Sequence, residues 1–288
     1  MRLKIWSIAL TLFLCFGYIV SQVKAAKPIS VKDNGMDEQF RNEATKQFMR
    51  PWSERRGIES IDRNAEVVLV KVPLDQLSNT LAEKAIESRH NVIGTEIEVS
   101  GTFVFAYQLV GHPWSIVVSD TLHLQSTELA QLSKQLEKPV IRLIVSDTSG
   151  IIGYNLFEGG RLVEYFQGEE GELADDSNEH GIKPQRYLLF PYPDDEPETQ
   201  QTAYFWSLRR QLTAKEIGNI WNFTDQFLLE YDAFDPAIDS SYLLGEYSLK
   251  RGDRYRVQNQ GFTLVLGSGQ KITSIPDLVR VDYFRLGN

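Results

Sequence analysis

The stretch VIRLIVSDTSGIIGYNLFEGGRLVEYF at residues 140–166 decides the fold, because strand-like runs alternate in it with turn signals. Branched and aromatic residues, which favour strands, dominate three runs at residues 140–145, 151–157 and 161–166. The runs are separated by Asp147-Thr148-Ser149-Gly150 and Glu158-Gly159-Gly160, which are typical of tight turns. We therefore predict three strands here, with a hairpin joining the last two.

Similar runs continue on both sides of this region. Val67–Val70 is a β-branched run that predicts a buried strand. Phe103–Leu109 alternates between apolar and other residues, and Trp114–Val118 follows after the break Gly111-His112-Pro113, so we expect a hairpin. Further strand-like runs lie downstream at Tyr187–Phe190, Tyr242–Leu249, Tyr255–Val257, Phe262–Leu266 and Leu278–Phe284.

Helical periodicity separates some of these runs. Leu74–Ala85 carries a one-sided apolar stripe, and Thr127 is expected to cap a helix that ends near Leu136. Thr213-Ala214-Lys215-Glu216 is a capping box, followed by the clearest helical stripe at Ile217–Tyr231. Strands followed by scattered helices predict an α+β fold with a mainly antiparallel sheet and a few packed helices.

We expect one α+β globular domain at residues 65–288, although the acidic, proline-containing region 168–198 permits a boundary. Residues 26–64 are polar and are predicted to be a linker with one short helix. That helix would place three apolar residues on one side: Phe40, Ala44 and Phe48.

Residues 1–25 predict export. Arg2 and Lys4 precede an uncharged run at residues 5–20, and small residues near Ala25 indicate a signal peptide cleaved after it. The alternative is an uncleaved membrane anchor formed by residues 5–20, which is shorter than the ~20 residues that a spanning helix usually needs. The globular part is therefore expected in the periplasm or outside the cell.

The chain contains one cysteine, Cys15, and it lies in this leader. A mature chain without cysteine excludes disulfides, cysteine-bound zinc, iron–sulfur clusters and a thiol nucleophile. Leu14 precedes Cys15, so the sequence does not match a lipoprotein signal. An exported protein without cysteine fits a bacterial envelope better than a eukaryotic secreted domain.

The net charge of −9 argues against nucleic acid or an anionic membrane surface as a partner. Ten acidic residues lie within residues 169–198, against only Lys183 and Arg186. We interpret this region mainly as a solvated loop. A loose calcium site or a surface for a basic partner is the alternative, although an EF-hand spacing is missing.

Two aspartates follow matching sequences, Val118-Ser119-Asp120-Thr121 and Val145-Ser146-Asp147-Thr148. If the preceding strands were parallel neighbours, both aspartates would lie at the same sheet edge, where ligands often bind. Asp120 and Asp147 are therefore weak candidates for the carboxylates of an envelope hydrolase. The alternative is that both are turn residues, which bond to nearby backbone amides.

The four histidines lack the spacing of a compact zinc site, and the sequence lacks a nucleophile elbow, a Walker loop and a dinucleotide fingerprint. We therefore predict no metal and no cofactor. Tyr107, His112 and Trp114 surround a predicted hairpin tip and are weak candidates for holding a small ligand. The alternative for these three side chains is simple packing.

The stretch Tyr107-Gln108-Leu109-Val110-Gly111-His112-Pro113-Trp114, together with Asp147-Thr148-Ser149-Gly150 and Gly153-Tyr154, resembles a bacterial, cyanobacterial-type protein family of unknown function. The resemblance covers about residues 65–167 and implies a recurring domain, but no activity and no catalytic residue.

We therefore expect an exported, non-enzymatic binding or interaction protein, with an unknown protein or small ligand as its partner. Its binding surface is predicted on the sheet at residues 103–166, beside exposed aromatic side chains near Trp114. A membrane would be contacted only through an uncleaved leader. The alternative function is the envelope hydrolase that uses Asp120 and Asp147.

Overall fold

The computed structural model describes residues 65–119, 125–146, 148–171, 181–191, 200–233, 249, 251–258, 261–264 and 278–287. All of them belong to one compact unit that begins at Gly35. The predicted signal peptide, the linker and nearly all of the predicted strand at Tyr242–Leu249 lie outside these residues. Within the described ranges, no helix combines the length and hydrophobicity needed to cross a membrane.

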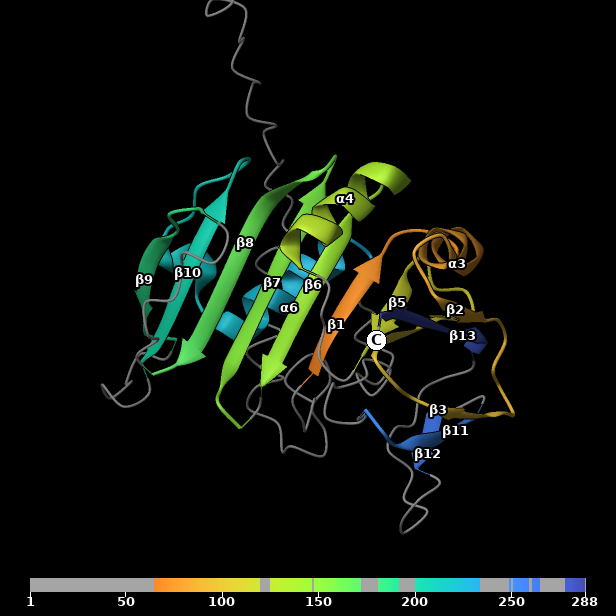
Figure 1. Cartoon of the computed structure of the whole chain (residues 1–288). Coiled ribbons are helices and arrows are strands. Elements are labelled where there is room, and N and C mark those ends of the chain that lie inside the picture. Colours follow the sequence, from red (N-terminus) through yellow and green to blue (C-terminus); the bar gives the residue numbers. More distant parts are fainter. Residues whose placement is uncertain are drawn as a thin grey trace, which may run out of the picture. The chain divides into compact units, whose positions relative to one another are not determined.

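Among the described residues, ten strands form one sheet in the order β2-β13-β4-β5-β1-β6-β7-β8-β10-β9 (Figure 1). Each neighbouring pair is antiparallel, which confirms the predicted α+β fold with a mainly antiparallel sheet. The strands are β1 (Ala65–Val70), β2 (Glu87–Arg89), β4 (Thr102–Leu109), β5 (Ser115–Val118), β6 (Val140–Ser146), β7 (Ile151–Glu158), β8 (Arg161–Glu170), β9 (Gln185–Leu189), β10 (Gln201–Ser207) and β13 (Leu278–Gly287).

A smaller antiparallel sheet has the order β12-β11-β3. Its strands are β3 (Glu96–Glu98), β11 (Arg254–Gln258) and β12 (Gly261–Leu264). Ile97, Tyr255 and Val257 from this sheet are buried and join the larger hydrophobic cluster of the main sheet. The two sheets therefore share one core.

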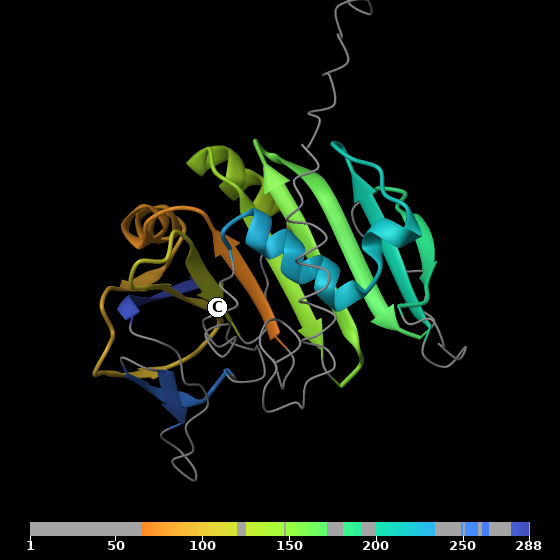
Figure 2. The ribbon, with the colours of Figure 1, turned by 180° about the vertical axis from the view of Figure 1, so that it is seen from behind.

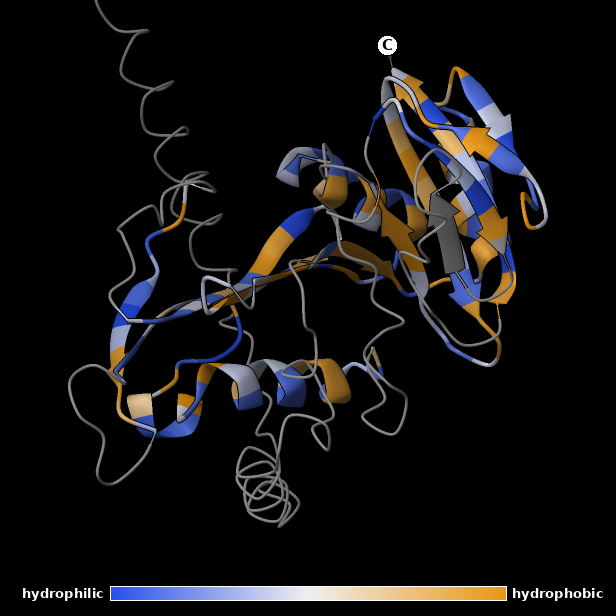
Figure 3. Ribbon diagram, turned by 90° about the horizontal axis from the view of Figure 1, so that it is seen from below, coloured by the Kyte–Doolittle hydropathy of each residue, from blue (hydrophilic) through white to orange (hydrophobic). Residues whose placement is uncertain are grey.

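Helices cover both faces of the main sheet. The helices α3 (Leu74–Ala82) and α4 (Ser126–Leu136) lie on the face that Figure 1 shows. The short α5 (Ala214–Ile217) and α6 (Ile220–Glu230) lie behind it, and Figure 2 shows α6 running across the strands. Seen from below in Figure 3, hydrophobic and hydrophilic residues are interleaved along the strands, as expected for strands with two different faces.

The alternation along β1 shows how the two cores divide. Val67 and Leu69 belong to the cluster under α6, whereas Val68 and Val70 belong to the cluster under α3 and α4. All four side chains are buried, because β1 lies in the interior of a sheet with both faces covered. A run of β-branched residues is what such a strand requires.

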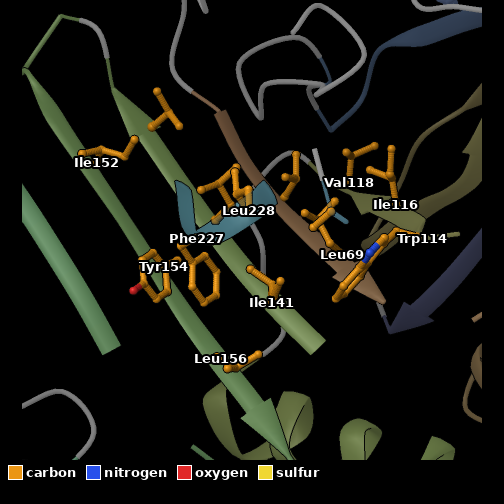
Figure 4. Close-up of a cluster of buried hydrophobic side chains, with 14 of the residues drawn as sticks. Leu69, Trp114, Ile116, Val118, Ile141, Ile152, Tyr154, Leu156, Phe227 and Leu228 are labelled. Carbon is orange, nitrogen blue, oxygen red and sulfur yellow. The ribbon is translucent and has the colours of Figure 1, made fainter. Parts of the chain in front are cut away.

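Aromatic rings form the centre of the core under α6 (Figure 4). The ring of Tyr154 on β7 lies parallel to the ring of Phe227 on α6, with 3.6 Å between the ring centroids. Phe223, one turn earlier on α6, packs against Phe166 of β8 with a centroid distance of 4.7 Å. The apolar stripe predicted from the sequence therefore faces the sheet.

Two predicted helix boundaries are corrected. Thr127 lies inside α4, and the N-cap is Gln125, whose main-chain N–H donates to Glu128 at 2.8 Å in a capping box. The predicted helix Ile217–Tyr231 is broken: α5 ends at Ile217 and is capped by Gly218, which has a φ of 65°. Asn219 then starts α6, because its side chain accepts hydrogen bonds from the first main-chain N–H groups of that helix. The capping box of Thr213 and Glu216 is confirmed.

Candidate functional site

The expected exposed aromatics near Trp114 are not found, because Trp114 and Tyr107 have no exposed surface. Both side chains point into the core under α6, as Figure 4 shows for Trp114. The Nδ1 atom of His112 lies 3.3 Å from the main-chain nitrogen of Trp114 in the turn before β5. The prediction of exposed aromatics is therefore wrong, and the packing alternative describes Tyr107 and Trp114.

Asp120 and Asp147 lie outside the described residues, but the strands before them are described. β5 and β6 run in the same direction, yet β1 lies between them, so the expected parallel neighbours are not found. Val117 and Arg142 both lie opposite Val68, so β6 continues about three residues further than β5. Strand ends two positions apart in the sheet and offset by ~10 Å along it do not meet.

A buried charged cluster fastens α6 and the chain before it to the sheet. Glu164 on β8 is almost fully buried and accepts hydrogen bonds from Tyr154 Oη at 2.8 Å and from Arg210 Nε at 3.0 Å. Burial and the carboxylate of Glu164 raise the pKa of Tyr154 well above its ordinary value. The guanidinium of Arg210 lies over the rings of Phe205 and Phe223, at 5.7 and 5.5 Å from their centroids. The cluster thereby links the chain at Arg210 and α6 to β7 and β8, which is a structural role.

A second cluster surrounds Asp282 of β13, which has no exposed surface. Its carboxylate accepts hydrogen bonds from Ser78 Oγ at 2.6 Å, from the main-chain nitrogen of Asn91 at 2.8 Å and from Arg280 Nε at 3.0 Å. The Nδ1 atom of His90 lies 3.2 Å from the same carboxylate. Burial opposes the charge, but these hydrogen bonds outweigh it and hold the pKa of Asp282 below its ordinary value. The cluster joins α3, the segment that follows β2, and β13.

Within the described residues, no group of three His, Cys, Asp or Glu side chains could hold a metal ion. The clusters around Glu164 and Asp282 are both centred on buried carboxylates whose oxygen atoms are already hydrogen-bonded. Within the described residues, the backbone groups that could still bind a partner lie at the two edges of the main sheet.

Among the strands of the described residues, β9 forms one edge of the main sheet (Figure 1). The main-chain nitrogen of Gly171 donates to the carbonyl oxygen of Gln200, and that of Leu208 donates to the carbonyl oxygen of Val163. Gln200 and Leu208 flank β10, so the backbone groups of even-numbered residues in β10 point to β8 and those of odd-numbered residues to β9. Odd-numbered residues of β10 lie opposite odd-numbered residues of β9. The N–H and C=O groups of Leu188 therefore point to the outer edge.

The side chains of β9 divide between a buried face and an exposed face. Tyr187 and Leu189 are buried in the core under α6, and Tyr187 Oη donates to the carbonyl oxygen of Leu212 at 2.8 Å. Leu188 points to the opposite face and is 47% exposed, and Phe190, just beyond the strand, is 57% exposed. Arg186, on the same side as Leu188, is also exposed. An outward-pointing backbone thus lies beside two exposed apolar side chains.

The opposite edge of the main sheet is built differently. β2 has only three residues, and Glu87 in it forms ion pairs with Arg89 at 2.7 Å and with Arg285 at 3.2 Å. Short, charged edge strands are a common protection against pairing with another chain. β9 is longer, and Leu188 within it and Phe190 just beyond it are exposed apolar residues, so we identify the edge strand formed by residues 185–190 as the candidate binding site.

The sequence held a signal for this edge, namely an apolar run, Leu188-Leu189-Phe190, between Pro184 and Pro191. Proline at both ends of a short apolar run is typical of an edge strand. The run predicts a strand, but its place at the edge of the sheet does not follow from the sequence.

No family model, curated protein or solved structure matches this chain. The resemblance of residues 65–167 to a bacterial family of unknown function therefore stays a prediction.

Proposed function

We propose that this chain is an exported, non-enzymatic interaction protein that binds an extended segment of a polypeptide by strand addition at β9. The observation that carries the proposal is the outward-pointing N–H and C=O of Leu188 beside the exposed side chains of Leu188 and Phe190. Main-chain hydrogen bonds to an added strand supply affinity, and side chains next to the edge supply selectivity.

The location proposed for this function is the periplasm or the extracellular space. This location is supported by the basic residues Arg2 and Lys4, the uncharged run at residues 5–20 and the small residues near Ala25. An acidic chain of net charge −9 also fits a protein partner better than nucleic acid or an anionic membrane surface. The hydrolase alternative with Asp120 and Asp147 stays a prediction from the sequence.

Photo-crosslinking tests the proposal in the producing cell. Leu188 is replaced by a benzophenone amino acid in the full chain, and Val110, which is 67% exposed next to β4, is replaced in the same way as the control. We expect a crosslinked polypeptide at position 188 and none at position 110, with the crosslink mapped to an extended segment.

A proline variant adds a backbone readout. In Leu188→Pro the ring removes an N–H that points away from β10, so the pairing of β9 with β10 is kept while strand addition is blocked. We expect the crosslink from a benzophenone at position 190 to be lost in this variant. Equal crosslinking at positions 188 and 110, or a crosslink at position 190 that survives Leu188→Pro, would contradict the proposal.

A further inference from the structure

We infer that the strand added at β9 is the β9 of a second copy of this chain, paired antiparallel about a twofold axis. This inference rests on the proposed function, since it names the polypeptide that occupies the same edge. A contact that uses the same surface on both copies is closed, so it yields a dimer rather than a fibre. The charged β2 at the other edge gives no second site for strand addition.

The exposed side chains of β9 complement each other under such a twofold. Centring the pair on Leu188 places Leu188 opposite Leu188 of the second copy, and Arg186 opposite Phe190 of the second copy. These residues alternate with the buried Tyr187 and Leu189, so they lie on the same face of the sheet. Leucine then packs on leucine, and each guanidinium lies beside an aromatic ring, which attracts cations.

The charge pattern also favours pairing in the antiparallel direction. Residues 181–191 contain Lys183 and Arg186 and no acidic residue, whereas the chain as a whole carries −9. Antiparallel pairing brings the basic start of each strand beside the end of its partner's strand and so keeps the two basic starts apart. Parallel pairing would place basic start beside basic start.

The size of the contact sets its strength. β9 has five residues and is followed closely by Pro191, so the paired strands form only a few main-chain hydrogen bonds. An interface of this kind falls below the ~1,200 Å² that stable complexes usually bury. We therefore expect a reversible dimer with a dissociation constant on the order of 1–100 μM, not a permanent one.

The dimer is tested first by mass. Sedimentation equilibrium of the purified chain over a hundredfold range of concentration is expected to show a monomer–dimer equilibrium. Leu188→Pro should weaken dimerisation at least tenfold with an unchanged circular dichroism spectrum, and Val110→Asp should leave it unchanged. If Leu188→Pro does not fold, Leu188→Lys, which keeps the backbone donor, replaces it and should also weaken the dimer.

A disulfide tests the register. Leu188→Cys is made in a Cys15→Ser background, which leaves no other cysteine. Outward-pointing residues opposite each other in an antiparallel pair have Cα atoms about 5.5 Å apart, which is within the range that a disulfide spans. Mild oxidation should give a covalent dimer from Leu188→Cys and not from the control Val110→Cys.

The outcomes separate the two proposals. A concentration-dependent dimer with the Leu188→Cys disulfide supports both. A chain that stays monomeric up to about 100 μM and forms no disulfide overturns the second copy. In that case, a position-188 crosslink to a different polypeptide still supports the proposed function, whereas no crosslink at position 188 overturns the proposed function as well.

Discussion

The indole nitrogen of Trp114 donates a 3.1 Å hydrogen bond to the main-chain carbonyl oxygen of Tyr231, 117 residues later in the chain. Lys71 Nζ donates to the same oxygen at 3.1 Å and lies 5.5 Å from the centre of the indole ring. Tyr231 is the C-cap of α6, where carbonyl groups have no partner within the helix. Trp114 before β5 and Lys71 after β1 therefore fix the C-terminal end of α6 to the sheet, so Trp114 stabilises the fold.

Trp114→Phe should lower the stability of the chain. The substitution keeps an aromatic ring in the core but removes the hydrogen bond to Tyr231 and leaves a small cavity. We expect a loss of about 1–3 kcal/mol in the free energy of unfolding, measured by urea denaturation. Val110→Ala, at an exposed position, should change this free energy by less than about 0.5 kcal/mol. A loss in Val110→Ala as large as that in Trp114→Phe would argue against this role.

Glu164→Gln should lower the stability of the chain more, because it leaves the partly buried guanidinium of Arg210 with only the more distant carboxylate of Glu230, at 3.8 Å. We expect a loss of about 2–4 kcal/mol, again from urea denaturation. The double variant Glu164→Leu with Arg210→Met removes both charges and should be more stable than Glu164→Gln. The single variants Glu164→Leu and Arg210→Met complete the comparison. If the loss of stability in the double variant equals the sum of the losses in these two, the two side chains do not act as a unit.

Much of the fold could be predicted because its strands and helices carry strong local patterns. The strand pattern of residues 140–166 gave β6, β7 and β8, and the apolar stripe of α6 gave the face that packs on the sheet. The break at Gly218 was missed, because a stripe of apolar residues continues across it and only the backbone turns. β2 and β3 were not predicted, because each has only three residues, most of them charged. Such a short segment does not show the alternation of a strand.

β10 was also missed, although Gln201–Ser207 contains Tyr204, Phe205 and Trp206, which favour strands. It decides the position of β9, because β10 is the strand that joins β9 to the sheet within the described part of the chain. The place of β9 at the edge therefore depends on pairing between distant segments, which one sequence does not reveal. The same holds for Asp282, whose partners Ser78 and His90 lie 204 and 192 residues away.

Gly168→Ala should destabilise the contact between β8 and α6. A Cβ atom at this position would lie 2.5 Å from Cγ2 of Ile220, which begins α6. Because Ile220 is itself fully buried, relief requires a shift of the helix, and we expect a loss of about 1–3 kcal/mol on urea denaturation. Adding Ile220→Val, which removes the δ-methyl group but keeps Cγ2, should recover little. In an Ile220→Ala background, Gly168→Ala should cost less stability than it does in the parent chain.

The lowered pKa of Asp282 predicts how the stability of the chain depends on pH. Its pKa is lowered in the folded chain from the ordinary value of 3.8, so the folded state binds a proton less readily than the unfolded state. The stabilisation is therefore fully present above about pH 5 and is lost as the pH falls below 3.8 and through the folded pKa. Asp282→Asn, which keeps the shape but removes the charge that faces Arg280, should be about 2–3 kcal/mol less stable at pH 7. Between pH 5 and pH 2, the urea midpoint of Asp282→Asn should change less than that of the parent chain. If the two midpoints instead change in parallel, the pH dependence comes from other carboxylates.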